Sequence, residues 1–229
     1  MRTKTKKETI ELKLGVHLSI AGGIDNVFRE ANRLGINCFQ IFLSSPRIWD
    51  VKQPTHKQIT VFKEESKKYK FIVVHAPYLV NFATDNILLF EKSVSRVLAD
   101  IKIMSELGIK FYVIHPGSSS TLNGVGRVKK AISLILDRTK EVTILIENLS
   151  GERNDVGKNL SELAELVEGF GGRVGLCLDT CHLFASGIDL RDKEQLQSFF
   201  DDLESRRLTE KVVMMHANDS KKGLSSGID

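Results

Sequence analysis

Short apolar runs rich in β-branched residues recur along the chain, and each ends on a side chain that can bind a metal. Five of these runs are FIVVH ending at His75, FYVIH at His115, TILIE at Glu147, VGLCLD at Asp179 and VVMMH at His216. Their ends lie 32 to 40 residues apart, which is the length of a strand, a loop, a helix and a second loop. The pattern therefore predicts repeated β/α units whose parallel strands deliver these side chains at one end of a sheet.

Two further apolar runs near the N-terminus complete the set of expected strands. We predict strands over residues 14–18, 37–43, 70–75, 111–115, 142–147, 174–179 and 211–216. Helical periodicity of apolar residues predicts helices over 23–34, 55–68, 86–107, 125–138, 158–168 and 191–204. Gly35 is the expected C-cap of the first helix, and Asn159 or Ser161 is the expected N-cap of the fifth.

The order of these elements predicts an α/β fold of the (β/α)8 TIM-barrel type, with seven β/α units visible and the eighth strand missing. A closed barrel of this class has eight strands, and the sequence stops soon after His216. An unpaired parallel edge promotes aggregation, so we expect a monomer only if the open barrel edge is covered. No linker divides the chain, and we expect residues 1–229 to form a single, C-terminally incomplete domain with a basic tail over residues 1–11.

Composition narrows the class of protein further. The chain has 229 residues, of which 41% are hydrophobic and 27% charged, enough for one sizeable core. It has no apolar run of about 18 residues that could span a membrane, and its start lacks the apolar core of a secretory signal. We therefore expect a cytoplasmic protein with no membrane partner. The net charge of +4 permits a nucleic-acid partner without demonstrating one.

The strand-end side chains are the candidate site. Catalytic residues of (β/α) barrels lie at the carboxyl ends of several strands, so parallel strands would bring three histidines and two carboxylates together. A single histidine at a strand end is more often structural, but five ligand-type residues in register favour a metal cluster. Imidazole and carboxylate ligands suit zinc.

Seven blocks that cover nearly the whole chain resemble the endonuclease IV family of apurinic/apyrimidinic endonucleases. The blocks are GVHLSIAGG at 15–23, FQIFLSSPRIW at 39–49, VVHAPYLVN at 73–81, VIHPGS at 113–118, LIENLSG at 145–151, LCLDTCHLFASGID at 176–189 and MHANDSK at 215–221. The resemblance implies a (β/α)8 barrel that binds three zinc ions and acts in DNA base excision repair. It also implies hydrolysis of the phosphodiester 5′ to an abasic site in double-stranded DNA by a zinc-bound hydroxide, leaving a 3′-hydroxyl.

The resemblance also assigns the metal ligands. They are His75, His115, Glu147, Asp179, His182, His216 and Asp229. Glu147 would bridge the first two ions and is the implied catalytic residue, while His182 and Asp229 would hold the third. The family has two further ligands that this sequence lacks after Asp229. We therefore expect weak occupancy of the third site, fewer than three zinc ions, and a chain impaired by truncation.

Three other side chains are implied to contact DNA. By resemblance, Arg47, Tyr78 and Leu79 would enter the duplex through the minor groove, fill the gap at the abasic site and help to turn the sugar out of the stack. His17 lies in the first block and is either a residue near a phosphate or a structural histidine.

Two other functions remain compatible with the sequence. One is a sugar isomerase or epimerase of the related metal-dependent barrel superfamily, which also uses strand-end carboxylates and histidines. The other is a DNA-binding remnant that recognises abasic sites without cleaving them. Turnover of a ketose would favour the first, and selective binding without cleavage at saturating zinc would favour the second.

Overall fold

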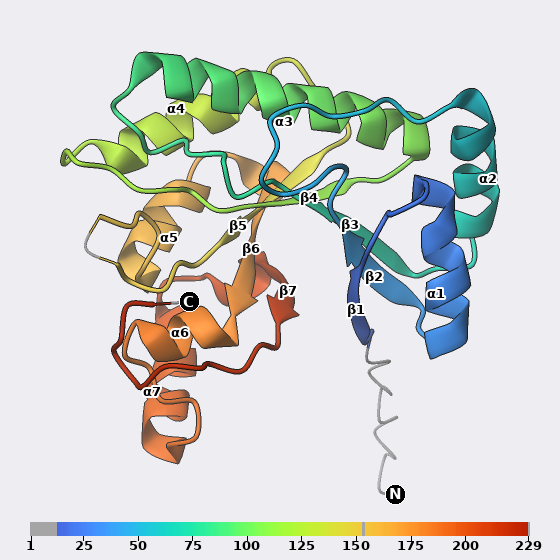
Figure 1. Ribbon diagram of the computed structural model, residues 1–229. Coiled ribbons are helices and arrows are strands. Elements are labelled where there is room, and N and C mark those ends of the chain that lie inside the picture. The colour runs from blue at the N-terminus through green and yellow to red at the C-terminus, as the bar shows by residue number, and fades with distance from the viewer. Residues whose placement is uncertain (1–12, 153, 229) are drawn as a thin grey trace, which may run out of the picture.

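The computed structural model describes residues 13–152 and 154–228, and their strands form one parallel sheet in chain order (Figure 1). The strands are β1 (Gly15–Leu18), β2 (Cys38–Ile41), β3 (Phe71–His75), β4 (Phe111–Ile114), β5 (Thr143–Glu147), β6 (Val174–Asp179) and β7 (Val212–His216). All seven predicted strands are confirmed, although His115 follows directly after β4 instead of ending it. The expected tail over residues 1–11 and the expected ligand Asp229 lie outside the described residues.

Helices connect the strands. They are α1 (Val27–Leu34), α2 (His56–Ser66), α3 (Ile87–Leu107), α4 (Gly124–Leu136), α5 (Leu160–Val167), α6 (Thr180–Ala185) and α7 (Lys193–Ser205), with 3-10 turns η1 (Ile24–Asn26), η2 (Gly171–Arg173) and η3 (Thr209–Lys211). The six predicted helices are confirmed to within a few residues at their ends. Gly35 adopts the left-handed conformation expected of a C-cap, with φ of 65°. The Asn159 side chain accepts a hydrogen bond from the Glu162 backbone N–H and is the N-cap of α5.

Helix α6 was not predicted from the sequence. It begins directly after β6, and the Asp179 carboxylate caps it by accepting a hydrogen bond from the His182 backbone N–H at 3.1 Å. The segment is short and mostly buried, so it lacks the polar face that would mark an amphipathic helix.

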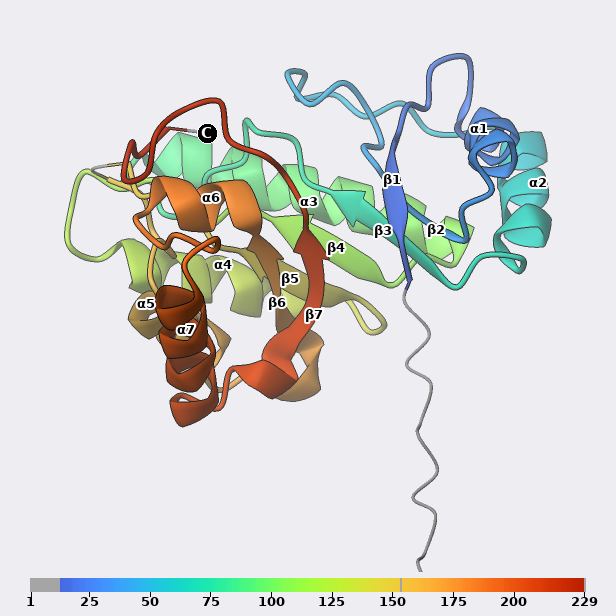
Figure 2. The same ribbon diagram turned by 90° about the horizontal axis from the view of Figure 1, so that it is seen from below.

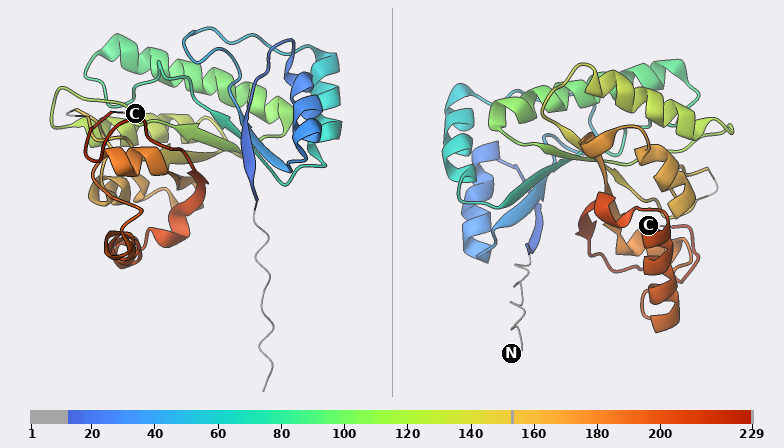
Figure 3. Two further views of the ribbon diagram at one scale, coloured as in Figure 1. Left: turned by 60° about the horizontal axis from the view of Figure 1, so that its bottom comes forward. Right: turned by 180° about the vertical axis from the view of Figure 1, so that it is seen from behind.

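The sheet is curled, and its helices lie on the convex outer face (Figures 1 and 2). Each strand pairs in parallel with its neighbour in the chain, so β1 and β7 are the two edges of the sheet within the described residues. Figure 3 shows these edges on either side of the open, concave face. The architecture is therefore the expected (β/α)8 barrel in an incomplete form, with seven strands in the described part of the chain.

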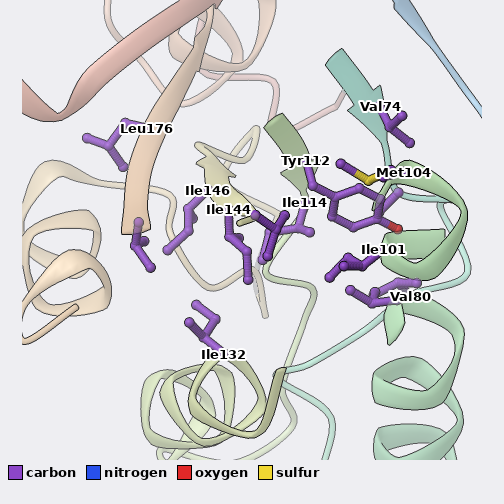
Figure 4. Close-up of a cluster of buried hydrophobic side chains, with 14 of the residues drawn as sticks. Val74, Val80, Ile101, Met104, Tyr112, Ile114, Ile132, Ile144, Ile146 and Leu176 are labelled. Atoms are coloured by element: carbon purple, nitrogen blue, oxygen red, sulfur yellow. The ribbon is translucent and has the colours of Figure 1, made fainter. Parts of the chain in front are cut away.

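Two apolar layers fix the strands. The outer layer packs the sheet against the helices, and Figure 4 shows part of it. Labelled members include Val74, Tyr112, Ile114, Ile144, Ile146 and Leu176 from the strands and Ile101, Met104 and Ile132 from the helices. The inner layer contains Val73, Val113, Leu145 and Cys177. Because side chains alternate across a strand, residues two positions beyond these inner residues also face the concave side, and they include His75, Glu147 and Asp179.

No helix in the described part of the chain is both long and apolar enough to cross a membrane.

Candidate metal centre

Glu147 lies at the centre of the strand-end cluster, with only 2% of its surface exposed. Its Oε2 atom is 3.0 Å from His75 Nε2 and 3.3 Å from His115 Nε2. Its Oε1 atom is 3.0 Å from His216 Nδ1 and 3.5 Å from His182 Nδ1. One carboxylate therefore contacts imidazoles from three different strand ends and from helix α6.

The surroundings keep Glu147 ionised. Burial alone would raise the pKa of this carboxyl, but the close imidazoles of His115, His216 and His75 outweigh burial and hold its pKa well below its usual range. Burial has the opposite sign for an imidazole, and it lowers the pKa of His75 despite the neighbouring carboxylate. The centre therefore combines a buried negative charge with a histidine that favours its neutral form.

Backbone carbonyls fix the ring orientation of two of the histidines. His75 Nδ1–H donates to the carbonyl of Ala76 at 2.6 Å, and His182 Nδ1–H donates to the carbonyl of Asn148 at 2.7 Å. A neutral ring that donates from Nδ1 keeps a lone pair on Nε2. Zinc-binding histidines commonly donate their other ring N–H to a carbonyl in this way.

The contact between His75 and Glu147 shows that these residues fit a cation. Neutral His75 has its proton on Nδ1, so its Nε2 lone pair faces a carboxylate oxygen at only 3.0 Å. Two lone pairs at this distance repel unless a cation lies between them. Ligand atoms about 2 Å from a tetrahedral zinc lie roughly 3.3 Å apart, close to the separations of Glu147 from His75 and His115.

Three groups of ligand atoms meet the distance requirement for a metal, with all atoms of each group within 4.8 Å of one another. The groups are His75, His115 and Glu147; Glu147, Cys177 and His216; and Glu147, Asp179 and His182. The first is the expected first zinc site. The third places His182 beside Glu147 and Asp179, whereas the resemblance assigned His182 to the third ion together with Asp229.

Asp179 is held in place by amide side chains. Asn218 Nδ2 donates to its Oδ2 at 2.6 Å, and Asn148 Oδ1 accepts from its backbone N–H at 2.7 Å. Its Oδ2 is also 3.6 Å from His216 Nδ1. Asp179 thus faces the centre while its other oxygen caps α6.

The site opens into a cleft of about 1020 Å³ on the concave face of the sheet. The cleft is lined by the metal-ligand candidates together with side chains of β1, β2 and β7, including His17, Gln40 and Met214. Tyr78 also lines it. A large ligand can therefore reach the centre from the open side of the barrel.

Comparison with known proteins places the chain in a family. A family model described as a xylose isomerase-like TIM barrel matches residues 28–229. A relative from Thermosipho africanus, named "Probable endonuclease 4", is 37% identical over 95% of this chain and 80% of its own length. A relative of the same name from Aquifex aeolicus is 40% identical over 94% of this chain and 79% of its own length. The chain belongs to the endonuclease IV family.

Solved structures agree with this membership. Endonuclease IV from Thermus thermophilus has a TM-score of 0.83 and 35% identity to this chain, and the match covers 94% of this chain and 79% of that one. A D-tagatose 3-epimerase-like protein has a TM-score of 0.66 at 20% identity, covering 90% of this chain and 76% of that one, and shares only the fold. The expected family and the TIM-barrel type of fold are thus confirmed.

The three residues expected to contact DNA lie in two adjacent loops, and Tyr78 is the one that lines the cleft. Arg47 is exposed, Tyr78 is 60% exposed, and Leu79 is half-buried. The Tyr78 ring centroid is 5.9 Å from that of His75 and 5.8 Å from that of His115. The Tyr78 backbone N–H donates to the Pro46 carbonyl at 3.1 Å, which joins the two loops.

A buried arginine that the sequence analysis missed anchors the loop that carries Arg47. The guanidinium of Arg96, on α3, donates to the carbonyls of Ile48 at 2.7 Å and Trp49 at 2.8 Å. It also pairs with Asp100 at 3.1 Å, and both residues are at most 5% exposed. The available signal was an Arg and an Asp four residues apart within the apolar face of a long helix.

Gln40 is the second functional candidate that the sequence analysis missed. It links two histidines, because His216 Nε2–H donates to its Oε1 at 2.9 Å and its Nε2–H donates to His17 Nδ1 at 3.0 Å. Partial burial and the charges of His75 and His216 lower the pKa of His17 to about 4. The signal was one polar residue between apolar neighbours in the strand Cys38–Ile41.

Proposed function

We propose that this protein is a DNA-repair endonuclease that uses zinc to hydrolyse the phosphodiester 5′ to an abasic site in double-stranded DNA, leaving a 3′-hydroxyl. The observation that carries the proposal is the buried Glu147 carboxylate surrounded by four imidazoles beside an open cleft. The endonuclease names of its relatives support the same reaction class.

The residues of the centre would hold the metal in two adjoining sets. His75, His115 and Glu147 would hold one zinc ion, and Glu147 would share a second with Asp179 and either His216 or His182. Zinc held by these residues would lower the pKa of water toward neutrality and would offset negative charge that develops on a phosphate. Glu147 stays ionised and His75 favours its neutral form, so both keep the lone pairs that a cation needs.

The two adjacent loops would select the damaged site. The exposed Tyr78 ring lies over His75 and His115, where it could fill the space of an absent base. The exposed cation of Arg47 would meet the phosphate backbone, and Leu79 would support Tyr78. An abasic nucleotide leaves the stack at lower cost than an intact one, so wedging by these side chains would favour damaged DNA.

The direct test is incision of a duplex that carries one synthetic abasic analogue. We expect cleavage on the 5′ side with added zinc, no cleavage with EDTA, and no cleavage of the matched intact duplex. Mapping of the product ends checks the 3′-hydroxyl. Selective binding of the abasic duplex without incision at saturating zinc would replace the proposal with a damage-binding protein, and equal binding of both duplexes without incision would refute it.

A further inference from the structure

The candidate ligand histidines differ in the group that accepts a hydrogen bond from one of their ring nitrogens. For His75 and His182 the acceptor is a backbone carbonyl, of Ala76 and Asn148 respectively. For His216 it is the side-chain oxygen of Gln40, which belongs to a strand at the other side of the sheet. A backbone acceptor is fixed by the fold, whereas a side-chain acceptor depends on residue identity.

We propose that Gln40 is a positioning residue that orients His216 for metal binding through Nδ1. This proposal takes one point from the proposed function, which is that His216 is a metal ligand. An amide oxygen can only accept a hydrogen bond, so the 2.9 Å contact with Gln40 Oε1 requires a proton on His216 Nε2. Nδ1 then faces Glu147 Oε1 at 3.0 Å and Asp179 Oδ2 at 3.6 Å.

The amide of Gln40 is itself held in the required orientation. Its NH₂ group lies 3.0 Å from His17 Nδ1 and donates to that nitrogen when neutral His17 carries its proton on Nε2. His17 in turn packs against Phe42, with ring centroids 4.5 Å apart. The contacts from His17 through Gln40 to His216 therefore form one consistent set of hydrogen bonds, in which His216 Nε2 is bound to Gln40 and His216 Nδ1 faces Glu147.

The position of His216 explains why a side chain is needed. It ends β7, which is an edge of the sheet within the described residues, and 14% of its side chain is exposed. The adjoining residues Val213 and Met215 are 41% and 51% exposed, so side chains on the outward face of β7 have few packing partners. Gln40 reaches across the concave face from β2 and supplies the restraint that packing does not.

Zinc affinity measured without DNA tests the proposal. Gln40→Met keeps the length of the side chain and removes both hydrogen bonds, so we expect zinc affinity to fall about 10- to 100-fold, the usual loss for a residue that orients a ligand. Gln197→Met changes an exposed glutamine on α7, outside the cleft, and should leave the affinity unchanged. Competition with a chromophoric chelator provides the measurement.

The variant Gln40→Glu distinguishes a loss of His216 orientation from general damage to the fold. A glutamate retains an acceptor oxygen for His216 Nε2–H, so this variant should bind zinc much more tightly than Gln40→Met. Equal losses in both variants, or an affinity of Gln40→Met within about twofold of the original protein, would overturn the role of Gln40. If Gln40→Met failed to fold, a folded Gln40→Glu with a loss of 10-fold or more would overturn it as well.

Nitrogen-15 NMR of the histidine rings shows which ring nitrogen of His216 carries the proton. A substitution at a residue with only a structural role would not change that result. In the zinc-bound protein we expect the proton of His216 on Nε2, and a mixture of the two ring forms in Gln40→Met. Retention of the single Nε2–H form in that variant would contradict the proposal. A protein that binds zinc in this manner but does not cut abasic DNA would refute the proposed function and leave the role of Gln40 intact.

Discussion

The interior strands of the sheet and its two edges build the same centre in different ways. On the interior strands β3, β5 and β6, His75, Glu147 and Asp179 are each at most 4% exposed. At the edges, the side chain of His216 is 14% exposed and His17 is partly exposed. Helices α3, α4 and α5 pack behind the interior strands, whereas outward-facing residues of β7 remain exposed.

This difference shows where the precision of the site comes from. In the interior, close packing fixes the strand ends, a backbone carbonyl orients His75, and the nearby amides of Asn148 and Asn218 hold Asp179. At the edges, polar side chains from distant strands replace that restraint, as Gln40 does for His216. Substitutions in the interior should therefore affect the fold and the metal together, and substitutions at the edges should affect mainly the metal and its selectivity.

We expect the largest effect, on the free energy of unfolding, for Arg96→Met on helix α3, which packs behind the interior strands. The substitution leaves the carboxylate of Asp100 buried at 1% exposure without its cation, and removal of one partner of a buried ion pair typically costs about 3–5 kcal/mol. Denaturant unfolding measures the loss. The double substitution Arg96→Met with Asp100→Leu should recover part of it, and a loss below about 1 kcal/mol in the single variant would show that the pair does not anchor this region.

Glu147→Gln should have the next largest effect, on incision of abasic DNA. The change removes the charge that all three candidate metal groups share, so kcat/KM should fall by more than about 100-fold, or roughly 2.7 kcal/mol of barrier. Steady-state kinetics on an abasic duplex measures it, with circular dichroism to check folding. Activity within about tenfold of the original would mean that Glu147 does not hold the metal.

Tyr78→Ala tests whether the loop after β3 selects abasic DNA. Loss of the exposed ring above His75 and His115 should weaken binding of abasic duplex about tenfold, near the lower end of the roughly 1–3 kcal/mol typical of a stacking side chain. Binding of intact duplex should change less. Phe200→Ala removes a similarly exposed ring on α7 and is the matched control, and a similar loss in both variants would exclude a specific role for Tyr78.

The smallest effect concerns His17 at the β1 edge. Because its pKa is lowered to about 4 from 6.5, the folded chain resists protonation of this ring, and the group destabilises the fold as pH falls from 6.5 to 4. The unfolding free energy of His17→Gln should therefore fall less than that of the original protein over this pH range. The difference between the two proteins should be under about 1 kcal/mol, because solvent screens a partly exposed side chain. Unfolding of metal-free protein at about pH 7 and about pH 4.5 measures this difference, and parallel pH profiles would contradict it.

The sequence was sufficient to predict the strands and the strand-end residues, because both follow from local patterns. Buried parallel strands are apolar runs, and a ligand at the end of each run marks the same edge of the sheet. Helix α6 was missed because it is short and buried almost all round. Gln40 was missed because its partner lies 176 residues away, and no local pattern reports which distant atoms a single polar side chain will meet. Arg96 was missed for the same reason, since it contacts backbone carbonyls of a distant loop.

The most direct test of a metal centre built around Glu147 is the zinc content of the purified protein, compared with that of Glu147→Gln after dialysis against metal-free buffer. All three candidate ligand groups include Glu147, so we expect stoichiometric zinc in the original protein and its loss in the variant. Equal zinc contents in the two proteins, or no retained zinc in either, would contradict a metal centre built around Glu147.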